Sequence, residues 1–129
     1  MRAVDTNILA RYLVRDDPAQ VALADAALAE SCFLPITVLL EITWLLASRY
    51  ATPRAKIAEA LEAVLQLPTV ATEDDSLVTW AIERFRAGAD FADMIHIMVS
   101  RRADSFISFD KRLARQAGPD APLPIETLA

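Results

Sequence analysis

Residues 3–9 read Ala-Val-Asp-Thr-Asn-Ile-Leu, so an acid, Asp5, stands where a short apolar strand gives way to a helix. Asp is favoured at the position that caps a helix, and capping is the structural interpretation of Asp5. In α/β proteins, residues at the carboxyl ends of parallel strands also line the crevice in which sites form. Residues 3–9 therefore predict a β–α beginning, and Asp5 is the first candidate site residue.

The same alternation of short strands and helices continues along the chain. Apolar periodicity and cap residues predict helices that begin near Ile8, Pro18, Val38, Pro53, Asp75, Phe91 and Lys111. Short apolar runs predict strands over residues 3–4, 32–34, 69–71, 105–109 and 123–126. This order predicts a single α/β domain over residues 1–129, with helices on both faces of a central, mostly parallel sheet of four or five short strands and about seven helices.

Composition sets limits on function. The chain has 129 residues, of which 54% are hydrophobic, and a formal net charge of −5. This acidity argues against a broadly basic surface for nucleic acid, so any polyanion must be met by bound cations and local Arg or Lys side chains. No apolar run approaches the roughly 18 residues of a membrane-spanning helix, and no signal peptide opens the chain, so we expect a cytoplasmic protein. The single cysteine, Cys32, lies in an apolar strand and is expected to be a buried core residue.

Glu41 is the second candidate, because it interrupts the apolar run over residues 38–46. Thr37 is the predicted cap of this helix, which is apolar almost all round and is therefore expected to be buried. A buried carboxylate is costly unless it meets a partner or a metal, or stays protonated. An ion pair with Arg11 or Arg49 is the structural alternative to a functional role.

Asp93 and Asp110 complete the acidic set. Asp93 follows Asp90 by three residues, which is the spacing of a helix cap and its reciprocal acid, and it also heads the apolar run over residues 94–98. Asp110 ends a predicted strand as Asp5 does, or caps the basic helix that follows. His96 lies in the same apolar helix as Asp93 and is interpreted as a packed core residue outside the site.

These four acids together predict a divalent metal. Two carboxylates about 4 Å apart repel by about 4 kcal/mol at an effective dielectric of 20, so a cluster of them needs a counter-charge. No Lys or Arg is adjacent in sequence to Asp5, Glu41 or Asp93. Oxygen ligands without a Cys or His set favour Mg²⁺ or Mn²⁺, and such ions serve phosphodiester chemistry.

The pattern resembles the PIN domain, specifically the VapC-type toxin ribonucleases of prokaryotic toxin–antitoxin modules. The resemblance rests on residues 4–7, on Glu41 after Thr37, and on the segments 90–96 and 105–111, and it runs almost the whole chain. It implies that the catalytic metal ligands are Asp5, Glu41, Asp93 and Asp110. It implies further that the supporting polar residues are Thr6, Asn7, Asp90 and Ser108.

The resemblance also implies an activity and partners. These are Mg²⁺- or Mn²⁺-dependent hydrolysis of RNA, a cognate antitoxin whose basic arm covers the acidic cleft, and a homodimer. Apolar residues such as Trp44 or Tyr50 are candidates for the dimer surface. Candidate side chains for gripping the RNA phosphates are Arg11, Arg15, Lys111, Arg112 and Arg115, and each is equally explained as part of a solvated face.

Three other interpretations remain open. An aspartate-nucleophile phosphatase also begins with an acid after its first strand, but it would place a second acid two residues later, where this chain has Asn7. A receiver-like module with an acidic Mg²⁺ pocket would need paired early acids and a late lysine, and only Lys111 is available. The third is a PIN domain that has lost catalysis and only binds its partner.

Overall fold

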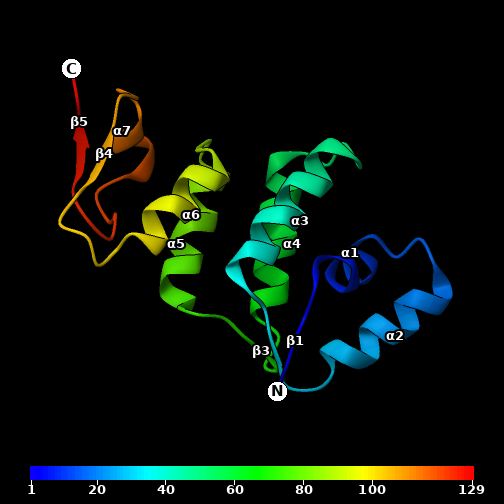
Figure 1. Ribbon diagram of the computed structural model, residues 1–129. Coiled ribbons are helices and arrows are strands. Elements are labelled where there is room, and N and C mark those ends of the chain that lie inside the picture. Colours follow the sequence, from blue (N-terminus) through cyan, green and yellow to red (C-terminus); the bar gives the residue numbers. More distant parts are fainter. The chain divides into compact units, whose positions relative to one another are not determined.

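A computed structural model describes residues 1–129, which divide into two compact units, Met1–Asp75 and Ser76–Ala129 (Figure 1). The prediction of a single domain over the whole chain stays a prediction. No helix in the structure combines the length and the apolar character needed to cross a membrane.

The first unit is built on a three-stranded parallel sheet in the order β1-β2-β3. The amide of Val4 donates to the carbonyl of Phe33 at 3.0 Å, and the amide of Leu34 donates to that of Ala71 at 2.9 Å, which continues the ladder past each strand end. The elements in chain order are β1 (Arg2–Ala3), α1 (Thr6–Val14), α2 (Pro18–Leu28), β2 (Cys32–Phe33), α3 (Ile36–Ser48), α4 (Arg54–Leu65) and β3 (Val70–Ala71).

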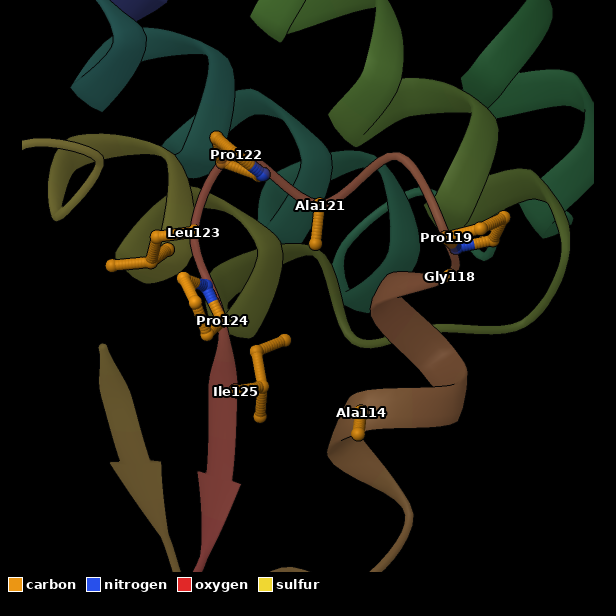
Figure 2. A pocket seen from close by; sticks show the side chains of 8 residues that line it. All are labelled: Ala114, Gly118, Pro119, Ala121, Pro122, Leu123, Pro124 and Ile125. Carbon is orange, nitrogen blue, oxygen red and sulfur yellow. The ribbon is translucent and has the colours of Figure 1, made fainter. Parts of the chain in front are cut away.

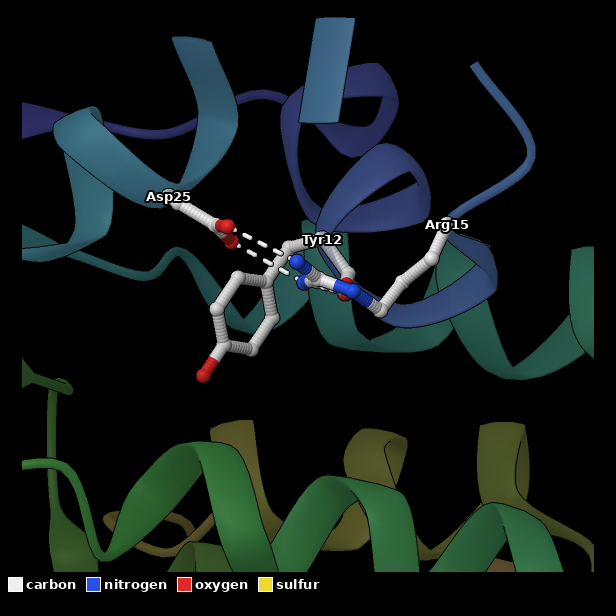
Figure 3. Close-up of polar contacts among 3 residues, drawn as sticks. All are labelled: Tyr12, Arg15 and Asp25. Carbon is white, nitrogen blue, oxygen red and sulfur yellow. Dashed lines mark hydrogen bonds and ion pairs between the residues drawn. The ribbon is translucent and has the colours of Figure 1, made fainter. Parts of the chain in front are cut away.

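Helices α1 and α2 are joined by an ion pair as well as by apolar packing. Both guanidinium ends of Arg15 donate to the carboxylate of Asp25, at 3.0 and 2.8 Å, and the same guanidinium lies 5.9 Å from the ring centre of Tyr12 (Figure 3). Val4, Leu28 and Cys32 form a buried cluster against which Tyr12 packs, and this confirms the prediction for Cys32. The ion pair and the apolar cluster therefore both fix the orientation of α1 relative to α2.

The second unit pairs two strands in parallel, with Phe106 opposite Ile125. The amide of Phe106 donates to the carbonyl of Pro124, and the amide of Leu128 donates to that of Ser108, both at 2.8 Å. Its elements are α5 (Asp75–Arg86), which begins at the last residue of the first unit, α6 (Phe91–Val99), β4 (Phe106–Ser108), α7 (Leu113–Ala117) and β5 (Ile125–Thr127).

The fold class predicted from the sequence is confirmed, since seven helices accompany five short strands that pair only in parallel. Two details differ. The strands are hydrogen-bonded in groups of three and two rather than in one continuous ladder. Thr37 is not the cap of α3, because Pro35 holds that position and makes no side-chain capping bond; the fixed φ of proline sets the start of the helix instead.

Candidate active site

Asp5 lies just beyond β1, at the carboxyl edge of the three-stranded sheet, and its side chain is exposed. Its Oδ1 accepts a hydrogen bond of 3.0 Å from the amide of Ile8, which caps α1 as predicted. This bond uses one carboxylate oxygen. Asp5 can therefore serve the helix and still offer its second oxygen to a cation.

Glu41 is exposed, so the prediction that it is a buried carboxylate was wrong. It belongs to a solvent-facing stripe of α3 that also contains Thr37, Trp44 and Ser48, at helical spacing, and the Trp44 side chain is 67% exposed. The structural alternative, an ion pair with Arg11 or Arg49, is not formed, and Arg11 bonds Asp16 instead, at 2.7 Å. Because α3 leaves the sheet at the carboxyl end of β2, the strand next to β1, Glu41 and Asp5 derive from the same sheet edge.

Asp90 and Asp93 begin α6 in the second unit. The side chain of Asp90 accepts a bond of 2.9 Å from the amide of Asp93, so the capping role expected of Asp90 is confirmed. Asp93 is half-buried, and this burial raises the pKa of its carboxyl group. The negative charges of Asp90 and Asp110 raise that pKa further, while His96 opposes them. His96 is exposed, which corrects its interpretation as a core residue.

Asp110 follows β4 and experiences the opposite environment. The backbone amide of Arg112 donates to its carboxylate at 2.9 Å and holds the pKa of Asp110 below its ordinary value, and the guanidinium of Arg112, at 3.4 Å, adds to this effect. The amide of Asp110 donates to the hydroxyl of Ser108 at 3.0 Å, which fixes the turn after the strand. Two carboxyl groups that interact with each other thus have pKa values shifted in opposite directions.

The donor set suits a hard cation. Asp5, Glu41, Asp93 and Asp110 contribute only carboxylate oxygens, the ligands that Mg²⁺ and Mn²⁺ prefer. No group of three or more His, Cys, Asp or Glu side chains in the structure could hold a metal ion, and neither unit alone carries more than two of these four acids. The second unit brings Asp93 and Asp110 within electrostatic reach of each other.

The candidate phosphate-binding side chains fall into two groups. Arg11 and Arg15 are held in ion pairs with Asp16 and Asp25. Lys111 and Arg115 are exposed and form no ion pair, while Arg112 contacts Asp110 itself. The free positive charges among the candidates therefore lie in and next to α7.

Sequence reasoning missed the residues that hold α7 in place. Trp80 Nε1 donates to the carbonyl of Ala117 at 3.1 Å, and Arg84 donates to the carbonyls of Gln116 and Arg115, at 2.6 and 3.2 Å. These carbonyls at the end of α7 have no partner within a helix, so side chains of α5 satisfy them. Nothing in the sequence pattern links residue 80 to residue 117, so the bond could not be predicted from it.

Two cavities differ in their relation to the acids. One, of about 220 Å³, is lined by Asp5 together with residues of α1 and α2. Another, of about 430 Å³, lies between α7 and the proline-rich loop before β5 (Figure 2), and none of the four acids lines it. The smaller cavity is therefore the one connected to the candidate site.

Comparison with known proteins supports one family. The family model for the PIN domain matches residues 2–119. Comparisons with curated proteins and with solved structures give no significant match.

Proposed function

Because the chain belongs to the PIN domain family, we propose that it is a metal-dependent endoribonuclease and the toxin of a type II toxin–antitoxin module. PIN domains form a superfamily of metal-dependent nucleases that act on RNA or DNA. Within that superfamily, the proposal of a ribonuclease toxin comes from the residues that the sequence shares with VapC-type toxins.

The observation that carries the proposal is the pair Asp93 and Asp110. Burial and neighbouring negative charge raise the pKa of Asp93, while the amide of Arg112 lowers that of Asp110. Carboxyl groups whose environments separate their pKa values in this way are typical of acid–base sites.

We assign Asp5, Glu41, Asp93 and Asp110 as the ligands of Mg²⁺ or Mn²⁺. A bound ion of this kind supplies a water molecule of lowered pKa and neutralises charge on the scissile phosphate. Asp110, whose ionised form is favoured, holds negative charge at all physiological pH values. One of the four acids would act as the proton acceptor for the attacking water.

The remaining partners belong to the same proposal. We propose a cytoplasmic protein, bound by a cognate antitoxin whose basic residues neutralise the four acids and Asp90. We also propose a homodimer to which the exposed Trp44 contributes, because large exposed aromatic side chains are enriched at protein interfaces.

The test is cleavage of a mixed pool of structured RNA by the purified protein with Mg²⁺, Mn²⁺ or EDTA, with single-stranded DNA as the competing substrate. Asp5→Asn and Glu41→Gln remove one charge each at exposed positions, and Asp104→Asn is the matched control at an exposed acid outside the set. We expect metal-dependent RNA cleavage that the first two variants lose and the control keeps. Binding of Mn²⁺ without any cleavage would instead support a non-catalytic binding module.

A further inference from the structure

We propose that the cavity of about 220 Å³ beside Asp5 is a subsite for one unpaired base of the substrate, preferentially adenine. This inference rests on the proposed function, because it assigns a specificity to that site. The cavity is lined by Asp5, Asn7, Ile8, Arg11, Gln20 and Leu23.

The size of the cavity selects a small, flat group. Sites for drug-sized ligands usually measure about 300–1,000 Å³, and this one, at about 220 Å³, lies below that range. A single base fits such a volume better than a dinucleotide does. The two helices that form its walls are held together by the Arg15–Asp25 ion pair, so the cavity is already formed without substrate (Figure 3).

The lining combines the two kinds of contact that unpaired bases make. Ile8 and Leu23 offer apolar surface, and Leu23 is 70% exposed. Asn7 and Gln20 offer side-chain amides that make no hydrogen bond within the protein, since the backbone amide of Gln20, not its side chain, bonds Asp17. Proteins recognise single-stranded RNA by stacking on base faces, mostly with aromatic side chains, and by hydrogen bonding to base edges. Here the aliphatic side chains of Ile8 and Leu23 would cover the base face.

The side-chain amides in the cavity favour adenine over guanine. A carboxamide pairs with the adenine edge through one donor and one acceptor, whereas guanine is usually read by the two donors of an arginine or by a lysine. One end of the guanidinium of Arg11, the arginine in this cavity, is already bonded to Asp16 at 2.7 Å. The polar side chains of the lining that have no partner in the protein are the amides of Asn7 and Gln20, and we assign base recognition to them.

The presence of Asp5 in the lining sets the position of this base relative to the cut. Asp5 is one of the four proposed metal ligands, so a base in the cavity belongs to a nucleotide next to the scissile phosphate. The subsite should therefore appear as a preference at one fixed position beside the cleaved bond.

The experiment compares short single-stranded RNAs that carry adenine, guanine or an abasic residue at one position. Binding is measured by fluorescence anisotropy with Ca²⁺, a hard cation that also takes carboxylate oxygens, in place of Mn²⁺, and cut positions are mapped separately with Mn²⁺. The test variant is Gln20→Leu, which replaces the amide with an apolar group of similar size. The control is Gln66→Leu, at another exposed glutamine of the first unit.

We expect the wild type and the control to bind the adenine RNA about tenfold more tightly than the abasic RNA, and Gln20→Leu to lose most of this ratio. Equal binding of adenine and abasic RNA by the wild type overturns the subsite, whether or not the protein cleaves RNA. An adenine preference without cleavage under any metal condition would leave the subsite standing and refute the proposed ribonuclease. A stronger preference for guanine would refute the assignment of Asn7 and Gln20 as the recognising groups.

Discussion

Asp5 has two proposed roles, as the cap of α1 and as a metal ligand. Replacing it by asparagine and by alanine separates these roles, because asparagine retains only the capping role. The carboxylate caps α1 through the bond to the amide of Ile8. Asparagine caps a helix about as well as aspartate, whereas alanine costs about 1 kcal/mol at such a position. Neither variant keeps the negative charge that a metal ligand needs.

The cost of losing the cap converts into a melting temperature. For a chain of 129 residues, an unfolding entropy of about 2.1 cal/mol/K per residue makes 1 kcal/mol equal to about 4 °C. We therefore expect Asp5→Ala to melt about 4 °C below the wild type in EDTA, and Asp5→Asn to melt within a degree of it. With Mn²⁺ added, only the wild type should gain stability, because ligand binding to the folded state raises the melting temperature.

The assay is differential scanning calorimetry with and without Mn²⁺, alongside RNA cleavage. If Asp5→Asn still gains stability from Mn²⁺ and still cleaves RNA, then Asp5 is only a helix cap and its assignment as a metal ligand is refuted. If Asp5→Ala melts with the wild type, the capping bond contributes nothing and our account of the start of α1 is wrong.

Three further predictions follow from particular side chains. Burial and the charges of Asp90 and Asp110 raise the pKa of Asp93 in the folded state, so its contribution to stability is greatest below the unfolded pKa and is lost as pH rises through the folded pKa. In EDTA at pH 7, calorimetry should therefore show a higher melting temperature for Asp93→Asn than for the wild type. An unchanged or lower melting temperature would contradict this. Glu41 is exposed and makes no ion pair, so Glu41→Gln should change the free energy of unfolding in urea by less than about 0.5 kcal/mol. Isothermal titration should show that this variant binds Mn²⁺ more weakly than the wild type. A large loss of stability would mean that Glu41 is structural. Gly118 has a φ of 78°, and a Cβ there would lie 3.0 Å from Cζ of Arg84, so Gly118→Ala should cost about 1–3 kcal/mol in urea melts. The control is Gly88→Ala, where φ is 115° and therefore also unfavourable for alanine but nothing lies within 4 Å of the added Cβ. Equal losses in the two variants would show that the Arg84 contact contributes nothing.

The sequence alone predicted those features that depend on residues near one another in the chain, such as helix caps and strand positions. The caps at Asp5, Asp17 and Asp90 were readable because each acid precedes an apolar periodic run, and all three side chains accept the expected amide bond. The strand positions were readable within about two residues for the same reason.

The exposure of Glu41 and His96 could not be read in this way. Both stand among apolar neighbours, so α3 and α6 looked buried all round, whereas each helix turns one narrow stripe to solvent and these residues lie on it. Which stripe faces outward depends on what packs against the helix, and that is information from distant parts of the chain. The bonds from α5 to the end of α7 were unreadable for the same reason, since they join residues more than 30 positions apart.

The pairing of β4 with β5 has a consequence for the time at which the protein becomes active during its synthesis. β5 is the only hydrogen-bonded neighbour of β4, and two short strands without a third are marginally stable even together. A ribosome polymerises Asp5, Glu41, Asp93 and Asp110 before it reaches Ile125–Thr127, so the nascent chain carries every proposed ligand while the strand that leads to Asp110 still lacks its neighbour. We expect a chain stopped before Ile125 to leave Asp110 mobile and to cleave no RNA, and full cleavage by that truncated chain would contradict this. On the proposed function, RNA cleavage therefore awaits the synthesis of β5 rather than that of the last proposed ligand.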